Sequence, residues 1–577
     1  MASTASGRSD PLPQVLVRGA SALSRDRIAW MVLAGGGLVS FLVSLWLTRG
    51  LTFHGDDFLY FIANRGFDFR VLIGPHNGNL IFVPRLLYAV VLALGGVRDY
   101  IVFRLLEAIG VVLVAALFFA LARRNIGAGA ALAVSFILLF FGSAWQDTVD
   151  PVGLAHVYGV AAGLGALLAL DAPARRRDGL ACALLVLAVI TFSTALSFLF
   201  AALVGVLLGP GRWRRLWIVA VPLAVYVAWF VAPKLNHSPF TSGTGFAVGN
   251  VDLVPAYFVH AARSVTDALT GLGYSFANPA SYTIDAPWGY LLTALILVGV
   301  AWRFGLRRVP APRAFWVALA LLVAYWASSA MVSDVLTRGP DQNRYMYDGG
   351  VIVLLVLVTA SGGWRPGPAA LWTVFGVVAL CLIGNVALLR AGGGYLRSST
   401  ASDRAMLAAV DLARGHVQPN FVPQGEPLLT FLDDIAGGSG PYLAAAWRNG
   451  SFAFTPAELR AQSEPVRELA DRNLVAALRL RLVSAGVAAR TRCLPVTSHP
   501  QPLDLTARSP GVLLRSTRAE AVTVAVRRFA AVAAVPVGSL EPRRFAALRI
   551  SPDHAPEPWQ VVLPTGNGVS VCRLGSP

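Results

Sequence analysis

The sequence predicts a polytopic α-helical membrane protein with about eleven spans, followed by a C-terminal α+β domain that contains a small β-sandwich. Of its 577 residues, 56% are hydrophobic and only 14% are charged, whereas about 25% of the residues in a soluble domain are charged. Apolar runs long enough to cross a bilayer recur through residues 28–390. After residue 510 the pattern changes to short alternating runs, which are typical of strands.

The apolar runs define eleven predicted spans within a membrane domain of residues 28–390. The spans are 28–48, 100–122, 129–144, 151–170, 179–192, 194–208, 216–232, 287–302, 314–332, 346–362 and 369–389. Two of them, 179–192 and 194–208, are short and share a polar hinge, so they can form one tight hairpin. The first span lacks a small-x-small cleavage motif, so we expect it to be an uncleaved signal anchor.

The distribution of charge predicts the orientation of the chain. With residues 1–27 in the cytoplasm, the inner segments hold seventeen arginines and four acids, which is the asymmetry expected of cytoplasmic loops. An odd number of spans then places the C-terminus outside. We therefore interpret the net charge of +17 as a topology signal of a multi-pass plasma-membrane protein with the bilayer as its partner, and not as a nucleic-acid site.

One further apolar stretch, residues 79–95, is not counted as a span. Counting it would invert every later loop and place the arginine clusters outside. We predict instead a helix that lies along the outer surface, with Arg85 on its polar side. Residues 49–99 then form the first outer loop.

The tail, residues 391–577, is predicted to be an exoplasmic domain, with a helical part over 391–490 and a β-sandwich over 491–577. The predicted strands are "GVLLRST", "AVTVAVRRF", "RRFAALRI", "PWQVVLP" and "GVSVCRL". Cys493 and Cys572 form an even pair in an oxidising compartment, so we expect a disulfide, with two unpaired thiols as the alternative. Trp559 either belongs to the core or stacks on a glycan.

The first outer loop carries the main candidate for chemistry. Asp56 and Asp57 are adjacent and follow the first span directly, in the run "HGDDFLYF". In one interpretation Asp57 caps the next short helix and Asp56 is a solvated acid. In the other, the acids gather with polar residues of the same loop at the lipid–water boundary and receive a lipid-borne substrate. Those polar residues are His54, His76, Asn77, Asn79 and Arg85.

Together these features resemble the GT-C superfamily of membrane glycosyltransferases. The resemblance rests on "HGDDFLYF", "PHNGNLIFVPRLLYAVVLALGGVRDYIVFRLL" and "FALARRN", which place acids after the first span, then a surface helix, then a second span ending in Arg-Arg. It covers residues 28–390. The family uses polyprenyl-phosphate-linked sugars, so the resemblance implies such a donor and a glycan, lipid or protein acceptor of the cell envelope.

The resemblance also implies that Asp56 and Asp57 are catalytic, with Asp56 as the base. A carboxylate within hydrogen-bond reach of the acceptor hydroxyl can take its proton as the oxygen attacks C1 of the sugar. The second acid would tune the first, bind hydroxyls or hold a divalent ion. A single displacement inverts the configuration at C1, so we expect an inverting glycosyltransferase.

A phosphate leaving group calls for positive charge, and arginine can meet its oxygens with two parallel N–H bonds. The candidate ligands are Arg85, Arg104, Lys234, Arg338 and Arg344, with Tyr345 beside the last. Each of several candidates has a structural alternative. Arg104 lies one turn before Glu107 and can pair with it, whereas Lys234, Arg344 and Tyr345 can anchor the chain at the membrane interface.

The second outer loop, "AWQDTVDPVG", adds Gln146 and Asp147 as candidate sugar ligands and also contains Asp150. An acid in this loop can bind a sugar hydroxyl or a cation, or it can cap the helix that begins at Pro151. A Mg²⁺ or Ca²⁺ site needs about six oxygens, to which Asp57, Asp147 and waters can contribute, although nothing in the sequence dictates such a site.

Two other functions compete with the transferase. A transporter or flippase of a lipid-linked sugar should show repeated halves and polar groups near mid-membrane, but we find no repeat, and the ionisable residues concentrate in outer loops. A non-catalytic envelope scaffold would work through its tail and would not need Asp56 or Asp57.

Overall fold

The structure, a computed structural model, divides into two compact units. The first comprises Met1–Arg49, Phe67–Leu87 and Ile101–Tyr395, and the second comprises Gly50–Gly66, Tyr88–Tyr100 and Leu396–Pro577. Two segments of the predicted first outer loop therefore belong to the same unit as the tail. The residues described are 12–64, 66–76, 78–97, 100–171, 175–231, 247–272, 283, 286–333, 339–425, 437–486, 493–495, 503–508, 510–563 and 568–573.

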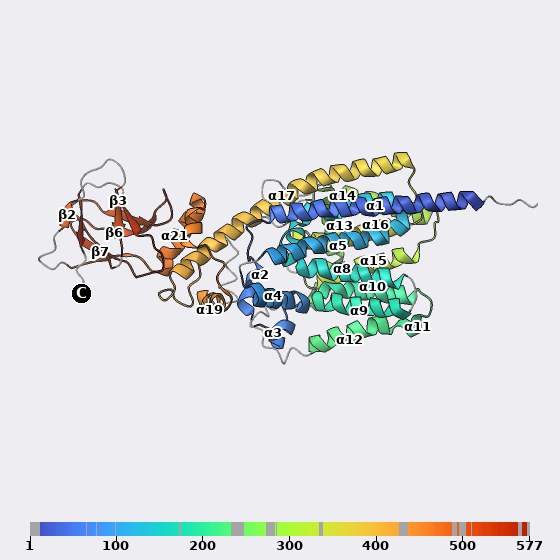
Figure 1. Cartoon of the computed structure of the whole chain (residues 1–577), viewed down its shortest axis with the longest axis horizontal. Helices are drawn as coiled ribbons and strands as arrows, with labels where there is room; N and C mark the ends of the chain where they lie inside the picture. The colour runs from blue at the N-terminus through green and yellow to red at the C-terminus, as the bar shows by residue number, and fades with distance from the viewer. Residues whose placement is uncertain are drawn as a thin grey trace, which may run out of the picture. The chain divides into compact units, whose positions relative to one another are not determined.

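The first unit is a set of helices that run side by side (Figure 1). They are α1 (Leu12–Leu47), α3 (Phe69–Ile73), α5 (Ile101–Ile126), α6 (Ala128–Leu139), α7 (Trp145–Thr148), α8 (Leu154–Leu170), α9 (Arg175–Thr191), α10 (Leu196–Leu207), α11 (Arg212–Arg215), α12 (Trp217–Val231), α13 (Val254–Thr270), α14 (Gly289–Ala301), α15 (Arg313–Met331) and α16 (Met346–Ala360). Two more helices, α4 (Phe82–Gly95) and α17 (Pro368–Leu412), have residues in both units.

Eight helical stretches among the described residues are long and apolar enough to cross a membrane, which confirms a multi-pass membrane protein. Each predicted span coincides with a helix, but three of these helices are not among the eight. They are α9, α10 and α16, with 17, 12 and 15 residues. A polar element explains one boundary: the short 3-10 turn Ser193–Ala195 separates α9 from α10.

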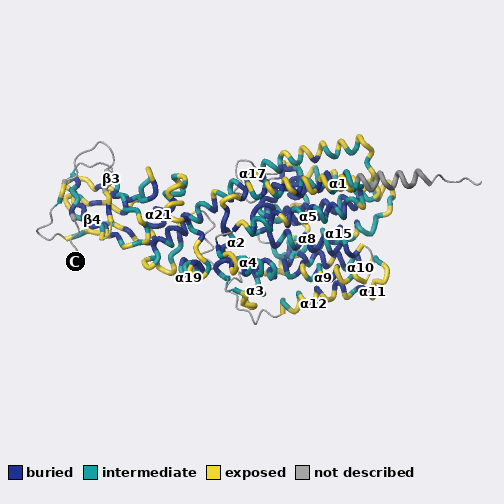
Figure 2. Tube along the Cα trace, in the orientation of Figure 1, coloured by how far each residue is buried: buried dark blue, intermediate teal, exposed yellow. Residues whose placement is uncertain are grey.

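The core of the first unit lies between α5, α6, α8, α10 and α16. Figure 2 shows buried stretches in α5 and α8 and exposed ones in α12. Small residues allow close approach between them. A Cβ added at Gly163 of α8 would lie 2.4 Å from the ring of Phe198 in α10. Such contacts are typical of helices packed in membranes, where small residues let backbones come together.

The second unit combines helices with two antiparallel sheets. Its helices are α2 (Asp56–Ala63), α19 (Ser439–Asn449), α20 (Pro456–Arg460) and α21 (Glu464–Ala477). Its strands are β1 (Leu482–Ser484), β2 (Cys493–Pro495), β3 (Leu503–Ala507), β4 (Gly511–Ser516), β5 (Val522–Arg527), β6 (Val535–Leu540), β7 (Phe545–Arg549), β8 (Trp559–Leu563) and β9 (Val569–Arg573).

The strands form a sandwich, as the sequence predicts. One sheet has the order β1-β7-β4-β9-β2 and the other β3-β8-β5-β6, and side chains of both sheets share one core with α21 and the end of α17. All five predicted strands are present. Trp559 is 0% exposed and lies under the guanidinium of Arg528, with the Arg Cζ 4.2 Å from the ring centroid, so the core interpretation is confirmed and the glycan-stacking one is wrong.

One predicted helix ends too late. The run "ELADRNLVAALRLRLVSAG" was expected to be helical throughout, but α21 ends at Ala477, Arg479 has φ 54°, and β1 begins at Leu482. Leu478 and Arg479 form a turn, and the left-handed backbone of Arg479 ends the helix before the strand begins. The prediction missed this turn because it contains no Gly, Pro, Asn or Asp, the residues that usually mark one.

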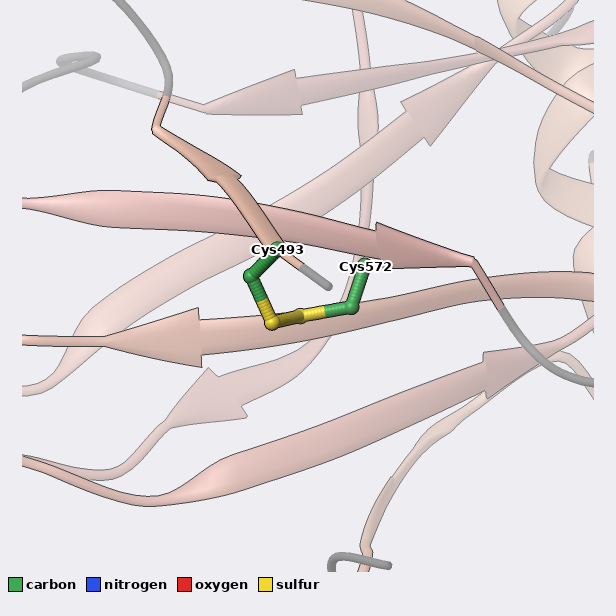
Figure 3. The surroundings of a disulfide bond; sticks show 2 residues. All are labelled: Cys493 and Cys572. Atoms are coloured by element: carbon green, nitrogen blue, oxygen red, sulfur yellow. A yellow bond between two sulfur atoms is a disulfide. The ribbon is translucent and has the colours of Figure 1, made fainter. Parts of the chain in front are cut away.

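The predicted disulfide is confirmed. Cys493 and Cys572 lie opposite each other in the antiparallel pair β2–β9 and are bonded, with a Cα–Cα distance of 4.2 Å (Figure 3). The bond links residues 79 positions apart and attaches the last strand to the strand that enters the sandwich.

Candidate functional site

The acid pair opens helix α2. Gly55, with φ 56°, precedes the helix, and both acids lie in its first turn, where the helix dipole stabilises negative charge. The N-cap is Gly55 and no side chain caps the helix. The interpretation in which Asp57 caps it is therefore wrong, because Asp57 already lies inside the helix and its carboxylate is engaged elsewhere.

Asp57 is fully buried and its two carboxylate oxygens accept hydrogen bonds from two tyrosines. Tyr88 of α4 donates to Oδ1, and Tyr100 donates to Oδ2. Both tyrosines are almost completely buried. Burial, and next the charge of Asp57, raise the pKa of Tyr88 well above its usual value, so its hydroxyl remains protonated and serves as a donor. These contacts hold the Asp57 carboxylate in one place.

Aromatic rings from the tail surround α2 within the same unit. Phe58 lies 5.9 Å from Tyr442 and Phe61 lies 5.1 Å from Phe452, measured between ring centroids. Phe53 contacts Tyr100 on the side of the acid pair at 5.1 Å. The helical part of the tail thus completes the apolar surroundings of the acid pair, and Asp56, which is half-buried, is the more accessible of the two acids.

His54 is also held by the tail. Its Nδ1 lies 2.9 Å from Oδ2 of Asp403 in α17, and both side chains are buried. This pair fixes the backbone just before the acids. His54, predicted as a substrate ligand, therefore has a buried carboxylate as its partner.

The segment before α4 is a tight turn closed by an arginine. The backbones of His76 and Asn79 are paired by hydrogen bonds of 3.0 and 2.8 Å, and Asn77 between them lies outside the described residues. Arg85 is buried, 6% exposed, and its Nη1 donates to the carbonyls of Val71, at 2.6 Å, and of Gly74. The expectation of a polar outer face at Arg85 is wrong, because this guanidinium is turned inward to cap a backbone segment.

Arg104 joins two helices of the first unit. Its Nε donates to Oγ1 of Thr48 at 2.8 Å, and its Nη2 donates to the carbonyl of Leu45. These acceptors lie in and just after the last turn of α1, so Arg104 holds α5 against the end of the first span.

A second cluster of ionisable side chains lies inside the first unit. His156 of α8 and Asp348 of α16 are paired at 3.0 Å. Asp147 of α7 is 1% exposed and lies within electrostatic range of both, and also of Glu107 and Arg344. Oδ2 of Asp147 and Oδ1 of Asp348 are buried without a hydrogen-bond partner among the described residues. Acids outnumber bases in this cluster.

The remaining predicted residues fall into different places. Asp150 accepts a hydrogen bond of 3.3 Å from the N–H of Val152 and caps the Pro151 turn, so the capping interpretation holds for Asp150, while Gln146 is half-buried. Arg344 lies over the ring of Tyr345, 5.2 Å from its centroid. Lys234 and Arg338 lie outside the described residues.

The structure gives the expected cation site no ligand set. Within the described ranges, no group of three His, Cys, Asp or Glu side chains is placed to hold a metal ion. A Mg²⁺ or Ca²⁺ ion therefore stays a prediction.

Sequence reasoning missed the two tyrosines that bond Asp57, the partner of His54, and the buried pair inside the first unit: Tyr88, Tyr100, Asp403, His156 and Asp348. For two of them a signal was present. His156 and Asp348 fall inside predicted spans, where an ionisable residue is a candidate for function by its position alone. The two tyrosines and Asp403 carry no such signal, because only the fold brings them to the acids.

Comparison with known proteins adds little. No family model matches the chain, and no curated protein matches it. Among solved structures, the chain is similar to the archaeal oligosaccharyltransferase AglB from Archaeoglobus fulgidus, determined in complex with an inhibitory peptide and a dolichol-phosphate. The identity is 14% and the TM-score 0.37, over 78% of this chain and 69% of that one. At that TM-score the likeness does not establish a common fold.

Proposed function

We propose that this protein is a membrane glycosyltransferase that moves a sugar from a polyprenyl-phosphate donor to an acceptor hydroxyl on the outer face of the membrane. The observation that carries the proposal is the unequal surroundings of two adjacent acids. Asp57 is buried and held by two tyrosine hydroxyls, whereas Asp56, one residue earlier in the same helical turn, is half-buried.

These unequal surroundings support different roles for the two acids, with Asp56 as the base and Asp57 as its support. Two hydroxyl donors favour the ionised form of Asp57, and a fixed negative charge beside Asp56 makes Asp56 a better proton acceptor. Asp56 takes the proton of the acceptor hydroxyl as that oxygen attacks C1 of the sugar. The bond from C1 to the phosphate oxygen breaks, and the polyprenyl phosphate leaves with the electron pair, so C1 is inverted.

The phosphate of the donor requires a cationic ligand. Arg85 and Arg104 already donate to backbone and side-chain oxygens that hold the fold. Arg344 is half-buried and lies over the ring of Tyr345, and an arginine guanidinium can meet a phosphate with two parallel N–H bonds. We propose Arg344, with Lys234 and Arg338, as the candidate ligands of the donor phosphate.

The depth of the second cluster disfavours the transporter. Asp348 is the third residue of α16 and His156 the third of α8, so each lies only about 3–5 Å along its helix at 1.5 Å per residue. A transport site is expected near mid-membrane, about 15 Å in. Ionisable groups one turn below a helix end fit chemistry at the surface.

The test is glycan analysis of cells that carry the wild type, Asp56→Asn or Asp57→Asn at equal protein levels. We expect Asp56→Asn to abolish one sugar linkage, since loss of a general base costs about 10²–10⁴-fold in rate. Unchanged glycans in Asp56→Asn cells would leave the scaffold function as the better account.

A further inference from the structure

An apolar groove of about 420 Å³ lies between α10 and α15 in the first unit. Phe200, Val204 and Leu208 form one wall, and Trp316, Ala320 and Val323 are on the other. The outer side chains of both walls, such as Trp316 at 48% and Leu208 at 52%, are exposed. In a helix pair that crosses a membrane, such a surface faces lipid.

One end of this groove is positively charged. Arg313, the first residue of α15 and one turn before Trp316, donates to the carbonyl of Gly205. Gly209, next to Leu208, leaves room for it, because a Cβ there would lie 2.8 Å from the Arg313 Nη2. The acceptor is a neutral carbonyl, so the guanidinium keeps its positive charge, with Asp171 within electrostatic range of it.

A second arginine adds to this charge. Arg215 is within electrostatic range of Arg313, is 6% exposed and is paired with Asp178 at 2.6 Å. Its remaining Nη1 is buried without a hydrogen-bond partner among the described residues. Arg212 and Arg214 of the same short helix are exposed. A buried donor without an acceptor among the described residues can be satisfied by an anion.

We propose that this groove holds an acyl chain of an anionic glycerophospholipid of the cytoplasmic leaflet, with the lipid phosphate at Arg313 and Arg215. Basic residues between spanning helices on the cytoplasmic side are the arrangement that binds anionic head groups. The sugar donor is the less suitable occupant, because the predicted orientation places these arginines at the end of α15 opposite the outer loops, where the donor phosphate must lie. The inference does not depend on the proposed function.

The experiment is native mass spectrometry of the purified full chain in detergent, with phosphatidylglycerol and phosphatidylcholine of identical acyl chains. We expect more phosphatidylglycerol to be retained, and Arg313→Gln to reduce that preference about fivefold, the effect of one basic residue at an anionic head group. Ala320→Phe should fill the groove and lower the retention of both lipids.

Matched controls are Arg176→Gln, another exposed inner arginine, and Ala301→Phe, an exposed alanine of α14. Val323→Phe repeats the groove test at a position that is 42% exposed without touching a charge. Equal retention of the two phospholipids by the wild type would overturn the proposal. It would also be overturned if the groove variants Ala320→Phe and Val323→Phe retained as much lipid as the control Ala301→Phe. Displacement of phosphatidylglycerol by added polyprenyl phosphate would assign the groove to the donor tail instead.

Discussion

Asp57 and Asp147 are both removed from solvent, but their surroundings differ. Asp57 has a hydroxyl donor on each carboxylate oxygen. Asp147 has an oxygen with no partner among the described residues and further acids nearby. A buried polar group without a partner costs about 1–3 kcal/mol, and native proteins retain such groups mainly where function needs them. Asp57 is therefore held by its partners, whereas one oxygen of Asp147 makes no hydrogen bond among the described residues.

The largest expected effect comes from the ion pair beside Asp147. His156→Leu removes the partner of Asp348 and leaves a buried carboxylate without its counter-charge, which should lower the free energy of unfolding by about 3–5 kcal/mol. Unfolding by dodecyl sulfate in mixed micelles measures it. Asp348→Asn is the matched control, because it keeps the shape and removes the charge, and it should cost clearly less. Equal losses would show that the pair acts through packing and not through charge.

The second-largest loss of stability is expected at Asp57, the acid with two tyrosine partners. Asp57→Ala leaves the hydroxyls of Tyr88 and Tyr100 buried without an acceptor, so we expect a loss of about 3 kcal/mol by the same measurement. Tyr88→Phe and Tyr100→Phe each remove one donor to the carboxylate and should cost about 1.5 kcal/mol. If Asp57→Ala were neutral, the view of Asp57 as a fixed support would be wrong.

A third acid, Glu464 of α21, has partners like Asp57 but is partly exposed. Burial would raise its pKa, but the N–H groups of Ala531, Val532 and Ala533 outweigh it and lower the pKa to about 2. The folded pKa is below the unfolded value of about 4.3, so this stability is present above that pH and is lost as pH falls toward 2.

Because the Glu464 side chain is 29% exposed, solvent screening reduces its contribution to about 1 kcal/mol. We expect Glu464→Gln to remove this part of the acid dependence, measured by unfolding the protein at pH 5 and pH 3. A variant with the same slope as the wild type between these two values would contradict the assignment.

The smallest effect on stability is expected at Asp147. Asp147→Asn removes a buried charge that has no partner on Oδ2. The attraction of this charge to His156 and Arg344 is opposed by burial and by repulsion from Asp348 and Glu107, so the free energy of unfolding should change by less than about 1 kcal/mol. The glycan product should fall by contrast. A loss of stability equal to that of Asp57→Ala would remove the distinction between the two acids.

The sequence predicted the elements well where a single period runs through a segment. Eleven apolar runs became helices, and five alternating runs became strands, because burial on one face imposes that period. The prediction failed at Arg479, where a turn ends α21 within an apparently helical run, and at Arg85, whose acceptors are backbone carbonyls of a neighbouring segment. Composition cannot reveal such acceptors, since every residue carries a carbonyl.

The site was predicted only in part for a related reason. The position of the acid pair after the first span indicated a site. The groups that distinguish Asp56 from Asp57, however, come from α4, from Tyr100 and from the tail, where Phe452 lies 394 residues after its ring partner Phe58. Contacts across such separations depend on the whole fold, and local periodicity carries no information about them.

The position of the disulfide has a consequence for handling the protein. Strand β2 is the terminal strand of its sheet and pairs with β9 through three residues, so the covalent bond is its main attachment. In a reducing buffer β2 would detach and leave the backbone donors and acceptors of β9 uncovered, a template for strand addition from a second molecule. Preparations made with a thiol reductant should therefore form oligomers through this edge.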